Sequence, residues 1–563
     1  MHTMDFVQVI VYIAALTVLA PLLGNYMADV LSQKRCFLSP LLRPVENATY
    51  RLSGVDPEKE MTWKQYCAAL LIFSGLGMAM VFCLQMAQKI LPFNPQHLPA
   101  VSWHLSLNTA ISFMTNTNWQ AYAGETTLSY LTQFLGLTVQ NFVSAASGIA
   151  VFAALCRGIA RRSSQTIGNF WADLVRSTVY ILLPLSLVFA VILVGQGVVQ
   201  TLSPYATATT LEGQQQIIPL GPAASQIAIK QLGTNGGGFF NANSAHPFEN
   251  PTPLSNFLEM LAILLVAAAL TYTFGTMVGS KKQGRILFIS MLILFIGGLA
   301  VSLYAEHADN RLLGVAGSLE GKETRFGITN SVIWSTATTA ASNGSVNAMH
   351  ESLSPLAALV AMFNLMVGEV IFGGVGSGMY GMIAYVILAV FIAGLMVGRT
   401  PEYLGKKIES FEIKMSVIAV LASSIVVLFF AALACITPAG LAGLSVSGTH
   451  GLGEVLYAFA STANNNGSGF AGLNANTPFY NLMTGAAMLI GRFSVIIPML
   501  AIAGHLAQKK FTPPSAGTFP TDGALFVLLL LGTIVIIGAL NFFPVLSLGP
   551  IIEHLFFIAG KGF

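Results

Sequence analysis

The chain has 563 residues, of which 54% are hydrophobic and only 9% are charged, and its formal net charge is +3. A soluble globular domain carries about 25% charged residues, so these charges are too few to cover a soluble protein of this length. Composition therefore excludes a soluble enzyme, a nucleic-acid-binding protein and a disordered chain, and it predicts an all-α polytopic membrane protein.

Ten segments are long and apolar enough to cross a membrane, which takes about 20 mainly apolar residues. They are 6–27, 66–86, 135–155, 179–199, 257–278, 286–304, 356–397, 415–436, 480–506 and 524–543. Basic residues cluster after every odd-numbered segment, and such connections stay on the cytoplasmic side. We therefore expect ten transmembrane helices with both termini outside.

Four of the outside connections share one pattern: a short apolar stretch, a polar turn, and then a full span. The four turns are Asn116-Thr117-Asn118, Thr234-Asn235-Gly236, Ser342-Asn343-Gly344 and Asn465-Asn466-Gly467. Their spacing of roughly 115 residues predicts four pseudo-repeats of span, pore helix, turn and span around a central pore. One extra helix precedes the repeats and one follows them.

The repeat pattern also predicts where the units begin and end. We place the first helix and its basic cytoplasmic loop in 1–62 and the four pore repeats in 63–165, 166–285, 286–413 and 414–510. The last helix and an external C-terminus fill 511–563.

The four turns are predicted to form a cation filter. Irregular backbone at membrane depth is tolerated only where it lines a cavity or is buried in protein. Carbonyl oxygens of such turns, with oxygens from Thr and Asn side chains, can replace the water shell of a cation. No Lys or Arg lies within the turns. Because Asn118 stands where the other turns have Gly, we expect an asymmetric pore; the alternative is four ordinary turns in exposed loops.

The seventh segment is about twice the length that a span requires. It contains Gly368-Glu369 and the run Gly373-Gly374-Val375-Gly376-Ser377-Gly378. We expect two half-helices joined by a loop below the filter, the alternative being close helix packing through small residues.

Two charges, Glu369 and Arg492, lie inside apolar segments and are functional candidates for that reason. We expect them to pair below the filter, with Arg492 preventing a cation from continuing straight to the cytoplasm. A purely structural ion pair is the alternative.

Charges at the two membrane surfaces give weaker indications. Arg399, Lys406 and Lys407 are candidate contacts for a cytoplasmic partner, or an ordinary basic flank of a span. The outside acids are interpreted either as attracting cations to the pore mouth or as a solvated surface; they are Glu125, Glu249, Glu306, Glu323 and Glu351.

The sequence contains neither a G-x-x-x-x-G-K-[ST] loop nor an Asp-Lys-Thr-Gly phosphorylation motif, so we expect this chain neither to bind nucleotide nor to hydrolyse ATP.

Fourfold repeats of this kind resemble the superfamily of potassium transporters, and longer motifs resemble the KdpA family in particular. This family comprises the potassium-translocating subunits of Kdp-type bacterial potassium ATPases. The motifs are Thr115-Asn-Thr-Asn-Trp-Gln120, Gly233-Thr-Asn-Gly-Gly-Gly-Phe-Phe-Asn-Ala-Asn243, His246-Pro-Phe-Glu-Asn-Pro251, Gly368-Glu-Val-Ile-Phe-Gly-Gly-Val-Gly-Ser-Gly378 and Gly398-Arg-Thr-Pro-Glu-Tyr-Leu-Gly-Lys-Lys407. Some family members carry Cys where this chain has Asn343.

The resemblance implies that K⁺ is the transported ion and that the partners are KdpB, KdpC and KdpF in a bacterial inner membrane. KdpB would hydrolyse ATP and receive the ion through a sideways tunnel below the filter. The loop with Gly373, Gly374, Gly376 and Gly378, together with Arg492, would bar the direct route. By motif position, the filter role falls on Asn118, Gly236, Gly344 and Gly467, with Gln120 beside the first turn.

Three functions stay open at this point. The first is the potassium-binding subunit of an ATP-driven pump. The second is an autonomous potassium channel or ion-coupled symporter of the same superfamily. The third, a scaffold with a vestigial pore, predicts degraded turns, whereas the four turns are intact.

Overall fold

The computed structural model describes residues 3–310, 314–368, 370–513 and 518–561. Within these ranges, ten helical segments are long and apolar enough to cross a membrane. The span helices are α1 (Thr3–Leu31), α3 (Trp63–Ala87), α6 (Val139–Ala160), α7 (Phe170–Arg176) with α8 (Leu183–Gly195), α10 (Pro253–Met277), α11 (Lys281–His307), α14 (Ser377–Val397), α15 (Ser410–Ile436), α18 (Pro478–Gln508) and α19 (Ala524–Leu546). The predicted number and approximate positions of the spans are confirmed.

The fourth span begins at Phe170 rather than near residue 179. Asn169 caps this helix, because its side chain accepts hydrogen bonds from the backbone N–H groups of Trp171 and Ala172 at 2.9 and 3.2 Å. The first turns of the helix carry Asp173 and Arg176 and are therefore less apolar than the rest of the span.

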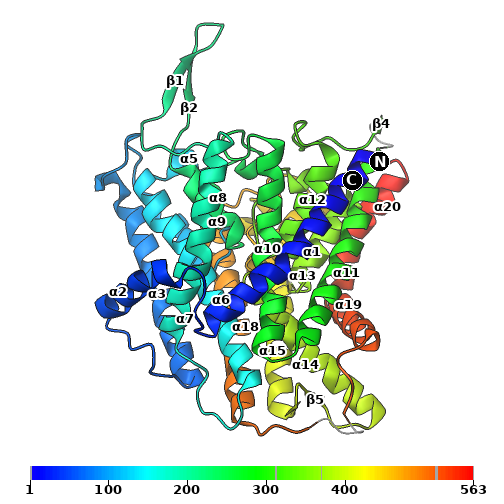
Figure 1. Ribbon diagram of the computed structural model, residues 1–563. Helices are drawn as coiled ribbons and strands as arrows, with labels where there is room; N and C mark the ends of the chain where they lie inside the picture. The colour runs from blue at the N-terminus through cyan, green and yellow to red at the C-terminus, as the bar shows by residue number, and fades with distance from the viewer. Residues whose placement is uncertain (1–2, 311–313, 369, 514–517, 562–563) are drawn as a thin grey trace.

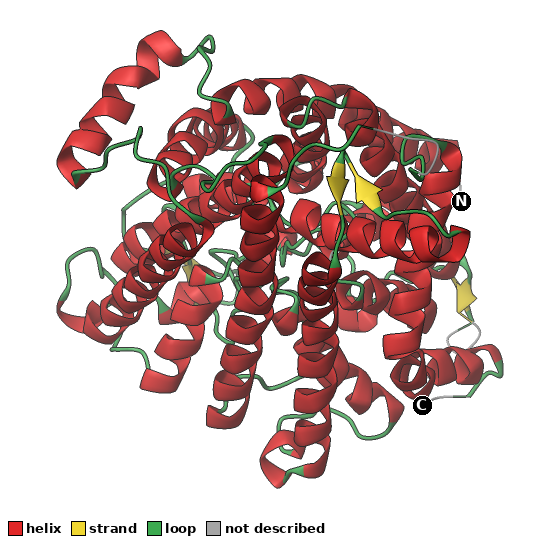
Figure 2. Ribbon diagram, turned by 90° about the horizontal axis from the view of Figure 1, so that it is seen from below, coloured by secondary structure: helices red, strands yellow, loops and turns green. Residues whose placement is uncertain are grey.

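Four shorter helices lie between the spans, one in each predicted repeat. These pore helices are α4 (Trp103–Met114), α9 (Ala223–Leu232), α12 (Gly327–Ala340) and α17 (Thr449–Ala463). Each ends directly before one of the four polar turns, which confirms the predicted order of pore helix and turn. Seen along the spans, the helices surround turns and loops near the centre of the molecule (Figure 2).

The repeats are arranged as a closed ring of helices, because the fourth packs against the first. In this contact α18 lies against α6, and a Cβ on Gly158 would lie only 2.5 Å from the carbonyl oxygen of Ala503. Small residues allow such close approach of two helices in a membrane. The extra helix α1 packs along α10, where the Thr273 hydroxyl donates to the carbonyl of Gly24 at 2.9 Å.

The long seventh segment is broken, as predicted. Helix α13 (Pro355–Met366) and α14 are separated by the irregular stretch 367–376, within which the structure describes every residue except Glu369. We call this stretch the crossing loop.

The remaining elements are short. They comprise helices α2 (Ser39–Ser53), α5 (Gly124–Thr127), α16 (Pro438–Leu441) and α20 (Ile552–Ile558), and the 3₁₀ or π turns η1 (Gln88–Ile90), η2 (Thr132–Thr138), η3 (Ser177–Leu182), η4 (Asn243–Ala245), η5 (His350–Ser352) and η6 (Ser547–Ile551). Three antiparallel hairpins pair β1 (Ala206–Thr209) with β2 (Gln215–Ile218), β3 (Asp309–Asn310) with β4 (Val315–Ala316), and β5 (Glu402–Tyr403) with β6 (Lys406–Lys407). Hairpin β1–β2 projects from the end of the molecule where α1 begins, and β5 lies at the opposite end (Figure 1).

Candidate functional site

The four polar turns touch one another in chain order and close a ring. A Cβ added to Gly236 would overlap the backbone nitrogen of Gly344, and one added to Gly344 would lie 2.7 Å from the carbonyl carbon of Gly467. A Cβ added to Gly467 would lie 3.2 Å from the carbonyl carbon of Asn118, and one added to Gly237 would lie 2.9 Å from the Asn118 Cβ. Glycine is therefore required where the backbones of neighbouring turns meet.

Asparagine side chains hold the turns together around the ring. Their amides donate to the neighbouring repeat: Asn116 to the carbonyl of Thr234 at 3.0 Å, Asn343 to that of Lys230 at 3.3 Å, Asn466 to that of Ala341 at 2.8 Å, and Asn465 to the hydroxyl of Thr117 at 2.9 Å. These side chains are buried. The Asn amides thus connect each turn to the neighbouring repeat.

In three turns the backbone N–H groups point back toward the pore helix. The N–H groups of Thr117 and Asn118 both donate to the carbonyl of Ser112, at 2.9 and 3.2 Å. In the second turn, Asn235 and Gly236 both donate to the carbonyl of Lys230, at 2.8 and 3.1 Å. Successive N–H groups that converge on one acceptor leave the carbonyl oxygens on the opposite side of the chain.

The fourth turn repeats this arrangement, and the backbone angles explain it. Asn466 N–H donates to the carbonyl of Ser461 at 2.9 Å, and Gly467 N–H donates to the Ser461 hydroxyl at 3.0 Å. The first and third residues of the three turns have left-handed φ angles, between 49° and 103°. Asn118 adopts this conformation with φ 55°, which Asn tolerates better than most residues with a Cβ.

The third turn has a different backbone. Neither Ser342 nor Gly344 has a positive φ, and the Thr338 hydroxyl donates to the carbonyls of Asn343 and Ser345, the latter at 2.7 Å. The asymmetry expected at Asn118 is therefore located elsewhere in the backbone. The first turn matches the second and fourth, and the third turn departs from them.

A wide vestibule opens above the ring, with a volume of about 900 Å³. The third residues of all four turns form its floor; they are Asn118, Gly236, Gly344 and Gly467. Gln120 also borders it, and its amide both donates to the carbonyl of Gly238 at 3.1 Å and accepts from the N–H of Gly238 at 3.0 Å. Gln120 therefore links the first turn to the second.

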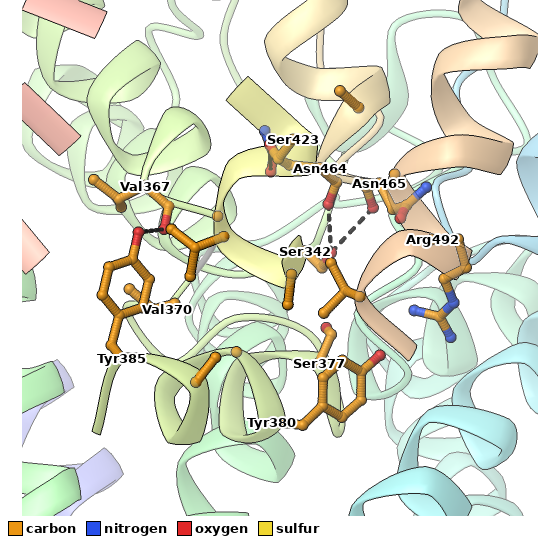
Figure 3. Close-up of a pocket in the computed structure, with 18 residues that line it drawn as sticks. Ser342, Val367, Val370, Ser377, Tyr380, Tyr385, Ser423, Asn464, Asn465 and Arg492 are labelled. Carbon is orange, nitrogen blue, oxygen red and sulfur yellow. Dashed lines mark hydrogen bonds between the residues drawn. The ribbon is translucent and has the colours of Figure 1, made fainter. Parts of the chain in front are cut away.

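A much smaller cavity, of about 60 Å³, lies on the other side of the ring. Ser342 and Asn465, the first residues of two turns, border it, and the Ser342 hydroxyl donates to the carbonyl of Asn465 at 3.0 Å (Figure 3). Since a water molecule needs about 10–15 Å³ measured this way, the cavity has room for a dehydrated ion or a few waters. We call it the inner cavity.

The crossing loop packs directly beneath the second and third turns. The Val375 N–H donates to the Thr234 hydroxyl at 3.0 Å, and Gly373 N–H donates to the carbonyl of Ala340 at 2.9 Å. A Cβ on Gly374 would lie 2.7 Å from the Ser342 Cβ. The loop lies below the turns, where the sequence placed it.

The glycines at the end of the crossing loop and the start of α14 fit narrow spaces. Gly376 has φ 100°, and a Cβ there would overlap the backbone of Gly148 on α6. A Cβ on Gly378 would overlap the carbonyl oxygen of Phe372. These positions have no room for a side chain, which explains the glycine run in chemical terms.

Arg492 of α18 borders the inner cavity and is buried, with 7% of its surface exposed. Its guanidinium extends toward α6, where it would lie 3.6 Å from a Cβ on Gly148, and Figure 3 shows it beside Ser342 and Asn465. The predicted partner Glu369 lies outside the described residues, so the pair stays a prediction. The structure places a fixed positive charge beside the inner cavity.

The three predicted partner contacts differ in accessibility. Lys406 is buried, and its ammonium donates to the carbonyls of Arg161 and Lys509, at 2.5 and 2.8 Å. It holds loops of the chain together and is not accessible to a partner in this structure. Arg399 and Lys407 are exposed, and for these two residues the interpretation as partner contacts stays a prediction.

Two buried ion pairs near the vestibule were not predicted. Lys230 pairs with Glu249, and Lys322 pairs with Glu306 at 2.7 Å, and all four side chains are fully buried. The expectation that Glu249 and Glu306 are exposed acids at the pore mouth is therefore wrong. A lysine in the short apolar helix α9, close before a polar turn, was the available signal for the first pair.

The sequence matches a known protein family over most of its length. Residues 10–555 match the model of the family described as KdpA, potassium-transporting ATPase A subunit. The chain is 57% identical to the potassium-transporting ATPase potassium-binding subunit of Rhodospirillum centenum over 562 residues, covering 99% of this chain and 98% of that one. It is 58% identical to the subunit of the same name from Herpetosiphon aurantiacus over 570 residues, covering 98% of each.

The fold also resembles the crystal structure of the potassium transporter TrkH from Vibrio parahaemolyticus. The TM-score is 0.53, the sequence identity is 14%, and the match covers 88% of this chain and 96% of TrkH. At this identity the similarity shows a shared fold.

Proposed function

The chain belongs to the KdpA family of potassium-transporting ATPase A subunits, and from this premise we propose that the ring of four turns is its potassium filter. In this proposal K⁺ enters from the vestibule, loses its water within the ring, and reaches the inner cavity. A separate ATPase chain then moves the ion onward with the energy of ATP hydrolysis.

The observation that supports the proposal most strongly is the closed ring of turns between two cavities. The third residue of each turn faces the vestibule, and first residues of two turns face the inner cavity. Carbonyl oxygens from three turns lie opposite the N–H groups that bind the pore helices. A ring of carbonyl dipoles is the established means of replacing the hydration shell of K⁺.

The direction of the path beyond the inner cavity follows from the crossing loop and Arg492. The loop fills the space below two of the turns, and a buried guanidinium beside the cavity repels a cation. Because both oppose a straight path, we propose that the ion leaves sideways, toward the ATPase chain.

The family assignment extends this proposal to partners and location. We propose that the ATPase chain is KdpB, that KdpC and KdpF complete the complex, and that Arg399 and Lys407 contribute to the cytoplasmic contact. We further propose that the complex lies in a bacterial inner membrane with both termini of this chain outside.

The test is to isolate the tagged chain in mild detergent from its potassium-starved host and to measure ATPase activity with K⁺ or Na⁺. The proposal predicts a co-purifying ATPase that K⁺ stimulates and Na⁺ does not. A chain that comes down alone and conducts K⁺ in liposomes without ATP would instead be an autonomous channel. Uptake driven by an ion gradient alone would indicate a symporter.

A further inference from the structure

Lys230 makes hydrogen bonds to both the second and the third turn. Its backbone carbonyl accepts hydrogen bonds from the N–H groups of Asn235 and Gly236 and from the amide of Asn343. Its side chain is fully buried in the last turn of α9, four residues before the second turn begins. A buried ammonium needs both a counter-charge and hydrogen-bond acceptors.

Two side chains meet these needs. The Lys230 ammonium forms an ion pair with the fully buried carboxylate of Glu249, and it donates to the side-chain oxygen of Asn243 at 2.9 Å. Glu249 is fixed in turn, because its other oxygen accepts from the N–H of Phe240 at 3.4 Å. The charge of Lys230 thus fixes the position of Asn243.

Asn243 carries this constraint to the turns. Its amide nitrogen donates to the carbonyl of Gly236 at 2.9 Å, and its oxygen also accepts from the N–H of Val346 at 3.4 Å. Gly236 is the third residue of the second turn, and Val346 lies two residues after Gly344, the third residue of the third turn. One side chain therefore ties together the outer ends of two neighbouring turns.

The other three repeats hold the backbone near their turns with uncharged side chains. At the position six residues before the third turn residue, they carry Ser112, Thr338 and Ser461 in place of Lys230. Each of these hydroxyls binds the backbone of its own repeat: Ser112 the carbonyl of Trp119 at 2.9 Å, Thr338 the carbonyl of Ser345 at 2.7 Å, and Ser461 the N–H of Gly467 at 3.0 Å. Among the described residues, the second repeat alone uses a buried ion pair and a relay residue for this purpose.

We infer that Lys230, held by Glu249, is a positioning residue that sets ion selectivity through Asn243. The inference rests on the proposed filter function and names one device by which the filter keeps its width. A carbonyl that is held in place cannot move to suit ions of another radius, so discrimination between K⁺ and Rb⁺ or Na⁺ depends on this relay.

The experiment measures, on the purified intact complex, the half-saturating concentrations of K⁺, Rb⁺ and Na⁺ for stimulation of ATPase activity. The double variant Lys230→Met/Glu249→Gln removes both charges and leaves neither one buried alone. We expect the Rb⁺-to-K⁺ ratio of half-saturating concentrations to fall about tenfold, as expected when a binding geometry loses its support. An unchanged ratio in an assembled, active complex would overturn the inference.

A second variant guards against a failure to fold. Asn243→Gly keeps the left-handed backbone, since Asn243 has φ 52°, and it removes the relay while the ion pair stays. The same fall in the ratio is expected. Lys230→Arg, which keeps the charge and can still donate to Asn243, should retain most of the discrimination; a ratio no better than that of Lys230→Met/Glu249→Gln would contradict the role of the relay.

The second buried pair supplies the matched control. Lys322 and Glu306 are equally buried, but Glu306 binds the N–H of Ser354, outside the four turns. Lys322→Met/Glu306→Gln should lower the yield and thermal stability of the complex about as much, with an unchanged Rb⁺-to-K⁺ ratio. An equal change of the ratio in both double variants would show a merely structural effect. If K⁺ does not stimulate even the wild-type complex, the proposed function fails, and the inference fails with it.

Discussion

The second and third turns have nearly the same sequence and different backbone conformations. Each places a hydroxyl residue, Asn and Gly in that order, in Thr234-Asn235-Gly236 and Ser342-Asn343-Gly344. In the second turn two N–H groups face the pore helix and bind the carbonyl of Lys230. In the third turn the carbonyl of Asn343 faces that side and accepts from the Thr338 hydroxyl.

The difference shows that the three residues of a turn do not by themselves set the direction of its peptide groups. The direction depends on the hydrogen bond made by the residue six positions before the third residue of the turn. Ser112 and Ser461 also carry hydroxyls there, but these bind Trp119 and Gly467 and leave the turn in the common conformation. In the proposed filter, the Asn343 carbonyl is already occupied by Thr338, so this turn contributes less to an ion than the other three.

The largest effect is expected from Gly236→Asp in the second turn. Gly236 has φ 90°, and its Cβ would overlap the backbone of the third turn, so the ring must open and a carboxylate would face the pore. We expect the affinity for K⁺ to fall on the order of 100-fold, because geometry at the site is displaced by about 1 Å. Na⁺ should begin to stimulate the ATPase; titration with both ions measures this.

Two alanine variants separate charge from crowding. Gly236→Ala should weaken K⁺ binding, but Na⁺ should stimulate the ATPase less in this variant than in Gly236→Asp. Gly344→Ala has no left-handed φ to strain and nearest contacts at 2.7 Å, so its effect should be smaller. An unchanged ion preference in Gly236→Asp would argue against the filter assignment.

The next largest effect is expected from Thr338→Val in the third turn. The variant keeps the side-chain shape and removes the hydroxyl, whose one hydrogen is shared between the carbonyls of Asn343 and Ser345, with a cost of about 1 kcal/mol. Released from the hydroxyl, the Asn343 carbonyl becomes available to the ion, and the affinity for K⁺ should change by about tenfold. Calorimetry or ATPase titration measures the change.

Thr339→Val is the control on the same helix. The Thr339 hydroxyl donates to the carbonyl of Ser335 at 2.7 Å within α12 and accepts from the Asn364 amide of α13 at 3.2 Å, so its partners lie outside the turn. This variant should leave the affinity for K⁺ nearly unchanged. Equal effects of the two variants would mean that helix packing, and not the orientation of the Asn343 carbonyl, is responsible.

A smaller effect is expected from Arg492→Gln beneath the third and fourth turns. Removing the positive charge beside the inner cavity lowers the barrier to a straight exit, so we expect a few-fold loss of K⁺ transported per ATP hydrolysed. Ion uptake and phosphate release, measured together in proteoliposomes, give this ratio. The same assay on Glu369→Gln tests the predicted pair, and normal coupling in both variants would remove these residues from the mechanism.

The smallest effect on transport is expected from pH, through His350 outside the spans. Burial and, to a lesser extent, the charge of Lys322 lower the pKa of His350 to about 4. His350 shares a 2.7 Å hydrogen bond with Tyr457, which bonds at 2.9 Å to Ser468 behind the fourth turn.

The lowered pKa of His350 determines the direction in which stability changes with pH. The folded protein keeps His350 neutral, and the unfolded chain takes up a proton below about pH 6.5. Stability is therefore fully present above pH 6.5 and falls by up to about 3 kcal/mol as the pH drops toward 4. Thermal unfolding of the complex between pH 4 and 7 measures this, and His350→Gln should flatten the profile; an identical slope in the variant would exclude His350 as its source.

Much of the architecture was predictable, because it depends on local chemistry. Span positions follow from apolar length, and the short helices with their turns follow from a repeated pattern of apolar and polar residues. The break between α13 and α14 was predictable from glycine density. The start of α7 was missed because its helix signal is the cap at Asn169 and not hydropathy.

Ion pairs were less predictable, because a charge in the sequence does not reveal its surroundings. By sequence, Glu249 and Glu306 belong to outside connections, where an acid attracts cations or faces solvent, but the fold buries both against lysines. Lys406 belongs by sequence to a basic stretch beside a span, but the fold buries it, and its ammonium binds two loop carbonyls. Burial of a charge depends on a partner that only the folded chain supplies.

The sequence by itself determined the ten spans, the fourfold repeat, the identity of the turns and the place of the crossing loop. Tertiary structure alone decided the ring contacts between turns, the reversed carbonyl of Asn343 and the relay from Lys230 through Asn243 to Gly236. The physical reason is the distance along the chain over which each interaction acts. Hydrophobic length and glycine content act within a segment, whereas the orientation of a peptide group depends on hydrogen-bond partners that the fold brings from other segments.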